Sequence, residues 1–170
     1  YAEVITLSRM AYRVMSEIGG NNETHLSKCG KAMLIYSILN DCKKNLKFLG
    51  KTDENIDLSI RAITEFKKHG VGVEDLKQQI DKTEDIYLKN KIKDMTYIYE
   101  KFEEKVQSNY IEETDLLTIL SNNIEKVDLI KNSIIYIDEF AGFTKQEYEI
   151  IRQMLKLAKD VNITICADNL

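Results

Sequence analysis

The sequence contains no proline and only seven glycines among 170 residues. Because proline ends helices and glycine weakens them, this composition favours long, uninterrupted helices. Apolar stretches stay well short of the roughly 20 residues that span a bilayer, so we expect no membrane contact. The chain opens on Tyr1 without a basic segment or a cleavage site, which predicts a piece of a longer protein with no secretory signal.

Cysteine and histidine are also scarce. The chain holds three cysteines without a C-x-x-C pair, and its two histidines are His25 and His69. This set excludes a zinc site, an iron–sulfur cluster and a disulfide scaffold within the chain, and it favours a reducing, cytoplasmic setting. The net charge of −4 argues against a strongly basic nucleic-acid module, although a local DNA-binding patch stays compatible with it.

Through the middle of the chain, apolar residues recur at three- and four-residue steps, which predicts amphipathic helices. In the longest helix the apolar seam begins at Leu88 and follows heptad-like steps, as in antiparallel helix packing. We interpret the pairs Glu103-Glu104 and Glu112-Glu113 as solvated helix faces. The expected helices span residues 26–49, 56–68, 73–80, 83–107 and 115–124.

The two ends of the chain have another pattern. Short, apolar, β-branched segments predict parallel strands near residues 4–7, 134–138 and 161–166. Ser8 is the expected cap of a helix after the first strand, and Thr144 with Glu147 predicts a capping box for a helix over 144–159. The run before residue 138 lacks polar alternation, which is typical of a strand buried on both faces. The predicted fold is therefore mostly α with α/β flanks, the last of which is one βαβ unit.

An acidic pair, Asp138-Glu139, ends the second of these strands. Four apolar residues followed by Asp-Glu is the Walker B pattern of P-loop ATPases. In such a site Asp138 would hold Mg²⁺, and Glu139 would orient or deprotonate the attacking water. An ordinary strand that leads into an acidic turn has the same letters, so that alternative stays open.

A phosphate-binding loop is missing from the pattern. The only Gly-Lys-Thr, at residues 50–52, follows a predicted helix rather than a strand, and Asn45 stands where the first P-loop glycine belongs. We therefore expect no Walker A and no complete nucleotide-binding site within this chain. A nucleophilic enzyme is not supported either, because no G-x-S-x-G elbow occurs.

Several segments resemble superfamily 1 helicase motifs in their usual order. Residues 4–11 resemble the strand–turn–helix of motif Ia, and residues 112–117 resemble the D-F-D-D-L-L segment before motif II. Asp138-Glu139-Phe140 resembles motif II itself, and Ala167-Asp168 lies where motif III has Gly-Asp. The resemblance implies that Thr6, Ser8 and Arg9 contact single-stranded DNA.

Residues 6–20, 45–70 and 133–168 are more closely similar to the amino-terminal region of AddB-type subunits of the bacterial ATP-dependent helicase/nuclease, particularly clostridial ones. The resemblance implies a parent hydrolase with helicase and exonuclease activity that processes double-strand DNA breaks for homologous recombination and repair. It further implies an AddA-type motor subunit as heterodimer partner, single- and double-stranded DNA as ligands, and ATP and Mg²⁺ as parent cofactors. The family's iron–sulfur cluster would lie outside this chain, in which we expect no cofactor.

The sequence also departs from motor helicases. These continue D-E-F with Gln-Asp, whose glutamine senses the nucleotide, whereas Ala141-Gly142 follows here. Motif III is reduced to Ala167-Asp168-Asn169. The resemblance then implies a helicase-like region that scans single-stranded DNA rather than driving translocation, with Glu139 either vestigial or water-orienting.

These observations predict a helical insertion in a RecA-like P-loop helicase domain. We expect residues 1–20 to form the motif Ia-like strand and helix, residues 21–125 the insertion, and residues 126–170 the Walker B-like part. Two alternatives remain open. One is an active superfamily 1 ATP-dependent motor, and the other is a non-catalytic helical scaffold or interaction domain.

Overall fold

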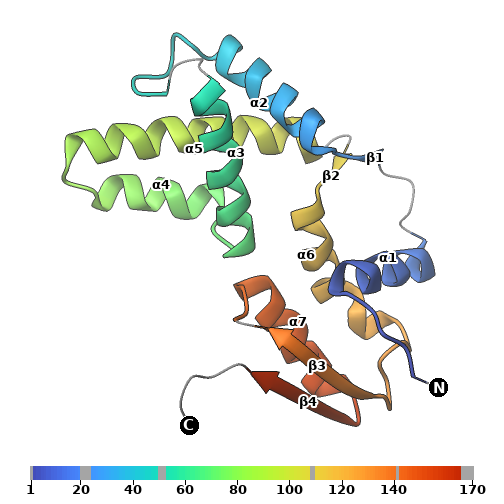
Figure 1. Ribbon diagram of the computed structural model, residues 1–170. Helices are drawn as coiled ribbons and strands as arrows, with labels where there is room; N and C mark the ends of the chain where they lie inside the picture. Colours follow the sequence, from blue (N-terminus) through green and yellow to red (C-terminus); the bar gives the residue numbers. More distant parts are fainter. Residues whose placement is uncertain (1, 20–23, 50–52, 108–109, 141, 166–170) are drawn as a thin grey trace. The chain divides into compact units, whose positions relative to one another are not determined.

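The computed structural model describes residues 2–19, 24–49, 53–107, 110–140 and 142–165. The chain is mostly helical, with a few short parallel strands (Figure 1). It divides into two compact units. The central unit comprises Glu23–Glu112, and the terminal unit comprises Tyr1–Asn22 together with Glu113–Leu170. None of the helices in the described ranges is both long and apolar enough to cross a membrane.

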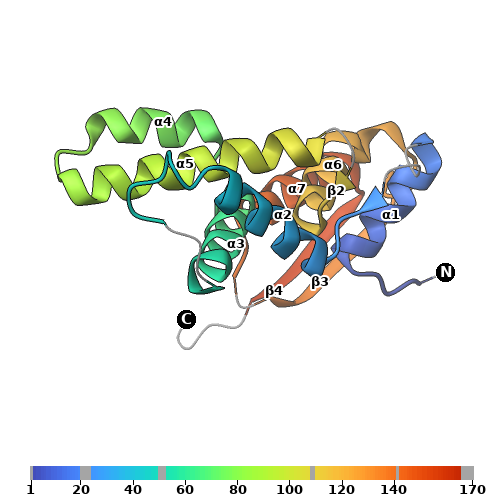
Figure 2. The same cartoon turned by 90° about the horizontal axis from the view of Figure 1, so that it is seen from above.

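The central unit is built from helices that share one core. Its helices α4 (Val73–Lys82) and α5 (Ile86–Gln107) are joined by a short turn and lie side by side in both views (Figures 1 and 2). Two two-residue strands, which the sequence did not predict, pair in parallel where the chain enters and leaves the unit. Its elements are β1 (Thr24–His25), α2 (Lys28–Asp41), α3 (Asp53–Lys68), α4 (Val73–Lys82), α5 (Ile86–Gln107) and β2 (Tyr110–Ile111).

The core of the central unit comes from the apolar stripes of these helices. Phe102 and Ile98 of α5 are fully buried, as are Ile35 of α2 and Ile63 of α3. Removing this much apolar surface from water is the main force that holds short helices together. The predicted seam of the longest helix is confirmed in its second half, but Leu88 is 50% exposed and does not belong to the core.

The end of α2 and the start of α5 differ from the prediction for reasons that the structure shows. Helix α2 ends at Asp41 rather than near residue 49, and the backbone N–H groups of residues 47–49 bind an acceptor outside the helix, described below. Helix α5 begins at Ile86 rather than residue 83, since the Asp85 carboxylate accepts hydrogen bonds from the backbone nitrogens of Tyr87 (2.8 Å) and Leu88 (3.0 Å). An aspartate in that position is a strong N-cap.

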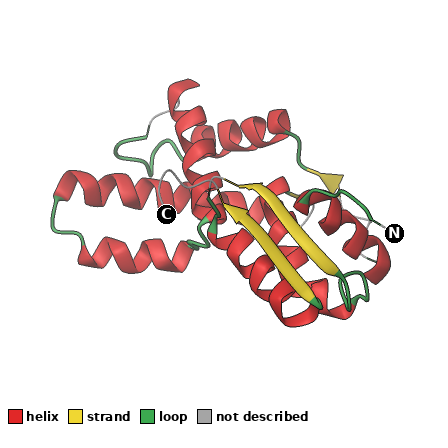
Figure 3. Cartoon of the chain, turned by 60° about the horizontal axis from the view of Figure 1, so that its bottom comes forward, coloured by secondary structure: helices red, strands yellow, loops and turns green. Residues whose placement is uncertain are grey.

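The terminal unit combines helices with one parallel strand pair. Helix α1 (Leu7–Ile18) packs against α6 (Glu113–Asn123), and α6 packs against α7 (Lys145–Leu157). Strands β3 and β4 are joined through α7, so the predicted βαβ unit is confirmed (Figure 3). The elements are α1 (Leu7–Ile18), α6 (Glu113–Asn123), the 3₁₀ turn η1 (Ile124–Lys126), β3 (Ile134–Phe140), α7 (Lys145–Leu157) and β4 (Asp160–Ile165).

Helix α7 begins as its sequence indicates. The Thr144 hydroxyl accepts the N–H of Glu147, whose carboxylate accepts the N–H of Thr144 at 2.7 Å, which completes the predicted capping box. In the same turn, the Gln146 amide donates to the Thr114 carbonyl (2.8 Å) and the Thr118 hydroxyl (2.9 Å) of α6. The start of α7 is therefore fixed to α6.

The strand pair is less enclosed than predicted. Ile134 and Tyr136 are 53% and 77% exposed, whereas Ile135 and Ile137 on the opposite face are only half-buried. The prediction of burial on both faces is therefore wrong for these residues. Uninterrupted apolar runs are typical of parallel strands inside large sheets, and the described sheet here has two strands.

The predicted strand at residues 4–7 is also wrong. Val4 is 99% exposed, and Leu7 is already the first residue of α1. Thr6 rather than Ser8 caps this helix, since its hydroxyl accepts the N–H of Arg9 at 3.2 Å. A strand needs a neighbour for its backbone hydrogen bonds, and none of the described strands pairs with this segment.

Candidate nucleotide and DNA contacts

Asp138 lies toward the carboxyl end of β3, beside β4. The Thr164 hydroxyl of β4 donates to Asp138 Oδ1 and is also 3.1 Å from the Ile137 carbonyl oxygen. Asp138 is exposed, on the same face of the sheet as Tyr136. Ligands of α/β folds bind beyond the carboxyl ends of parallel strands, and Asp138 lies two residues before the end of β3. Its role as a Mg²⁺ ligand stays a prediction.

The described residues supply only part of a nucleotide site. Mg²⁺ takes close to six oxygen ligands, usually one or two carboxylates with waters and substrate phosphates. No cluster of three or more histidine, cysteine, aspartate or glutamate side chains suited to a metal ion occurs in the described part of the chain. Asp138 is therefore a single carboxylate that suits Mg²⁺, and the described residues do not complete a metal site around it.

Other predicted positions lie outside what the structure describes. These are the side chain of Glu139, residue Ala141, the Gly-Lys-Thr at 50–52, and the motif III-like residues 167–169. The predictions for them stay predictions.

The three residues predicted to contact DNA come together at the start of α1. Ser8 is half-buried in the first turn, and Arg9 is exposed. Although Thr6 caps the helix, a hydroxyl that accepts one hydrogen bond still has its own proton to donate. The three side chains therefore offer two hydroxyls and a guanidinium around one helix end.

The charge distribution at this helix end favours an anion. Helix α1 has no acidic residue in its first turn, so its positive dipole end is not neutralised from within the helix. Arg13, one turn later, is paired with Glu3 at 2.7 Å, whereas Arg9 forms no ion pair among the described residues. A phosphate would find backbone N–H groups, hydroxyls and a guanidinium here.

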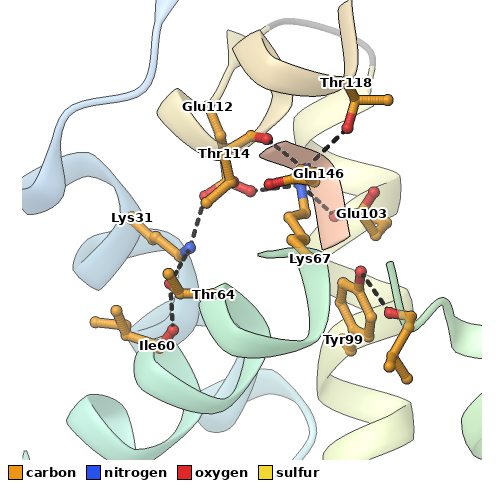
Figure 4. Close-up of polar contacts among 11 residues, drawn as sticks. Lys31, Ile60, Thr64, Lys67, Tyr99, Glu103, Glu112, Thr114, Thr118 and Gln146 are labelled. Atoms are coloured by element: carbon orange, nitrogen blue, oxygen red, sulfur yellow. Dashed lines mark hydrogen bonds and ion pairs between the residues drawn. The ribbon is translucent and has the colours of Figure 1, made fainter. Parts of the chain in front are cut away.

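The central unit contains a buried ion cluster that the sequence did not predict (Figure 4). Glu112 is only 3% exposed, so its interpretation as a solvated helix face is wrong. Its two carboxylate oxygens meet Lys31 Nζ at 2.7 Å and Lys67 Nζ at 2.5 Å. Lys67 also meets Glu103 at 2.8 Å, and the cluster of two lysines and two glutamates is electrically balanced.

An aromatic ring supports the cluster. The Phe102 ring centroid is 5.3 Å from Lys31 Nζ and 5.8 Å from Lys67 Nζ, within the range of cation–π attraction. Lys31 also donates to the Thr64 hydroxyl at 3.0 Å. Lys31 lies one turn before the buried Ile35, and Lys67 lies one turn after the buried Ile63, so both lysines occupy core-facing positions of their helices. A charged residue at such a position was the sequence feature that could have indicated a buried ion pair.

On the surface of the same unit, Lys77 of α4 joins α5. Its ammonium is 2.8 Å from Glu100 of α5 and 2.9 Å from Glu74 of its own helix. The hydrogen bonds that the ammonium donates to Glu100, and less strongly to Glu74, raise the pKa of Lys77 above its ordinary value of 10.5. The side chain is therefore charged throughout the neutral range.

Comparison with known proteins decides the family. The profile of the family described as "ADDB, N-terminal" matches residues 1–170, which is the whole chain. The chain belongs to this AddB N-terminal family. The resemblance of the sequence motifs to AddB-type subunits is therefore confirmed at the level of the family.

Curated relatives agree over the full length of the chain. It is 37% identical over 171 residues to a protein from Clostridium botulinum strain Hall that is named as the B-type subunit of an ATP-dependent helicase/deoxyribonuclease. Proteins of the same name from Clostridium tetani and Clostridium kluyveri are each 38% identical, over 175 and 172 residues. In all three cases the match covers 99% of this chain but only 15% of the relative, so the chain spans about one seventh of their length.

Proposed function

We propose that this chain is the helicase-like amino-terminal region of the AddB-type subunit of an ATP-dependent helicase/deoxyribonuclease, which processes double-strand DNA breaks for recombinational repair. The observation that carries the proposal is the match of the whole chain to the AddB N-terminal family. The names of the clostridial relatives supply the activity of the longer protein. That activity, its ATP and its metal belong in this proposal to the complete subunit and its complex.

The architecture supports a RecA-like domain with a helical insertion. Residues 1–22 and 113–170 are far apart in the sequence but form one compact unit, which contains the parallel β3–α7–β4 segment. Residues 23–112 form a second unit in one continuous stretch. An insertion between two parts of a core gives this division. We propose that the central unit is the insertion and that the terminal unit is part of the helicase-like core.

We assign single-strand contact, rather than translocation, to this core. The start of α1 offers Thr6, Ser8 and Arg9 to a phosphate, and the sequence of residues 4–11 resembles motif Ia of superfamily 1 helicases. In contrast, Ala141-Gly142 replaces the Gln-Asp that links ATP hydrolysis to movement. In this proposal an AddA-type partner subunit supplies the motor while this region scans the displaced strand.

Substitution of Arg9 tests the DNA contact. In the full-length subunit with its partner subunit, we expect Arg9→Ala to weaken binding of a labelled single-stranded oligonucleotide severalfold. The slope of log affinity against log salt should fall by about 0.7, since one phosphate contact is lost. Arg152→Ala is the matched control, because Arg152 of α7 is another exposed arginine of the same unit. If Arg9→Ala and Arg152→Ala bind the strand alike, the assignment at α1 is wrong.

An active motor is the rival function, and the exposed position of Asp138 near the carboxyl end of β3 is the observation in its favour. A non-catalytic scaffold would be favoured by an Asp138 buried away from any sheet edge. The observed position, exposed and within β3, does not favour it. The measurement that separates motor from scanner is the substitution of Glu139 described at the end of the Discussion.

A further inference from the structure

A buried aspartate shapes the surface loop that follows α2. The Asp94 carboxylate of α5, 4% exposed, accepts the backbone N–H groups of three consecutive residues, Lys47, Phe48 and Leu49. The donor–acceptor distances to its Oδ2 are 2.9, 2.6 and 3.0 Å. Hydrogen bonds to an ionised acceptor are stronger than neutral ones, so this carboxylate fixes the end of the loop firmly.

The loop is fastened at two further points. The Asn45 amide donates to the Tyr97 hydroxyl of α5 at 3.1 Å, and the Asn45 N–H bonds the Cys42 carbonyl at 2.8 Å. Leu49 is 2% exposed and lies in the core. Residues 42–49, which we name the lysine loop, therefore have a defined backbone, although the sequence predicted a helix here.

What the lysine loop presents to solvent is basic and aromatic. Lys43, Lys44 and Lys47 are all exposed, and none of them forms an ion pair among the described residues. Phe48 is 53% exposed, so its ring is accessible to a ligand while its backbone is held in place. The nearest acidic residue in the sequence, Asp41, lies 3.7 Å from the Lys105 ammonium, so its charge is partly offset.

We propose that the lysine loop is a single-stranded DNA contact of the central unit, in which Phe48 stacks on a base and Lys43, Lys44 and Lys47 meet the phosphates. Sites that bind single strands without reading sequence combine these two elements, a positive surface and an exposed aromatic ring. The inference rests on the proposed function for its ligand, but it concerns a different unit from the one that contains α1.

The chemistry of the loop favours a single strand over the other candidates. A duplex offers phosphates to the lysines but keeps its base faces stacked, so Phe48 would find no partner. An acidic protein surface would meet the lysines but gives an exposed phenyl ring no specific role.

Asp94 explains why a loop can serve as such a contact. Its carboxylate holds the backbone of Phe48 and its neighbours in place before the strand binds, which lowers the conformational entropy lost on binding.

The test uses the full-length subunit in complex with its partner subunit. Two variants separate the two kinds of contact: Phe48→Ala, and the triple Lys43→Gln, Lys44→Gln, Lys47→Gln. The matched controls in the same unit are Tyr87→Ala, which removes an aromatic ring that is 72% exposed, and the triple Lys28→Gln, Lys82→Gln, Lys91→Gln, which removes three other exposed lysines. The probe is labelled oligo(dT), and its affinity is measured across a range of salt concentrations.

We expect the two variants to differ in salt dependence. Phe48→Ala weakens binding roughly tenfold with no change in the salt slope, because base stacking on an aromatic ring releases no counterions. The lysine triple lowers the slope by about 2, since each phosphate contact to a single strand contributes about 0.7. Strands that carry 5-iododeoxyuridine should photo-crosslink to the peptide that contains residues 43–49, and Phe48→Ala should abolish that crosslink.

Several results would overturn the proposal. One is that the lysine loop variants bind and crosslink the strand as well as their control variants do. Another is an equal loss of affinity for blunt duplex, which would assign the loop to double-stranded DNA. A third is loss of the partner subunit from the lysine triple with unchanged DNA binding, which would make the loop a protein interface. If Arg9→Ala weakens single-strand binding while the loop variants do not, this inference fails alone. If the unvaried complex binds no single strand, the proposed function fails with it.

Discussion

Glu112→Gln should destabilise the central unit strongly, because it breaks a buried cluster that is electrically balanced. Two ammonium groups and two carboxylates sum to zero charge, and loss of one carboxylate leaves a net +1 among side chains that are mostly buried. Removing one partner of a buried ion pair costs about 3–5 kcal/mol, since the remaining charge has lost both water and its partner. We therefore expect a local destabilisation of that size.

Hydrogen exchange in the full-length subunit measures this effect locally. Exchange through local opening follows the opening free energy, so a loss of about 3–5 kcal/mol speeds exchange by roughly a hundredfold to a few thousandfold. Peptides from α3 and α5, which carry Lys67 and Glu103, are the ones to follow. The neighbouring Glu113→Gln is the control, because Glu113 is exposed in the first turn of α6 and its loss costs at most about 1 kcal/mol.

A double variant tests the reasoning about charge balance. Glu112→Gln with Lys67→Gln removes one charge of each sign and returns the cluster to zero. We expect its cost to be smaller than the sum of the two single costs by about 1–3 kcal/mol, as for residues in one network. Strict additivity, or a Glu112→Gln variant that exchanges like Glu113→Gln, would refute the account of the cluster.

Three further outcomes follow from the structure. Asp94→Ala removes the acceptor of three loop N–H groups, so exchange at residues 47–49 should rise by a factor that corresponds to at least about 2 kcal/mol, while peptides of α7 stay unchanged. Thr144→Ala should cost the terminal unit about 1 kcal/mol in thermal unfolding and Thr144→Ser much less, because serine keeps the capping hydroxyl. The pKa of Lys77 is raised, so its contribution to the α4–α5 contact is complete below pH 10.5 and is lost only as the pH rises through the raised pKa. An NMR titration of Lys77 with a midpoint at or below 10.5 would contradict this.

The sequence predicted those parts of the fold that depend on local pattern. The capping box at Thr144 and the parallel β3–α7–β4 order are visible in neighbouring residues, because caps and hydrophobic periods act over a few positions. The same local logic extended α2 through residue 49. It failed there because Asp94, 45 residues later, binds the N–H of Leu49 in place of the helix.

Long-range contacts also explain the errors at the candidate sites. The ion cluster joins Lys31 to Glu112 across 81 positions, and no local pattern marks Glu112 as buried. Residues 4–7 have the composition of a strand, but Thr6 caps α1 and no described strand pairs with them. For Asp138, the pattern located the carboxylate toward the end of a parallel strand, whereas its contact with Thr164 of the next strand needed the structure.

The claim that this region scans DNA without driving translocation is tested most directly by Glu139→Gln in the complete helicase/nuclease complex. Glu125→Gln is the matched control, because it removes the same charge from an exposed position of the terminal unit. ATP turnover and DNA unwinding are measured with saturating ATP and Mg²⁺ on a blunt duplex. We predict that Glu139→Gln turns over ATP and unwinds DNA at the rates of Glu125→Gln, whereas a drop of tenfold or more in either rate would show that this subunit is itself a motor.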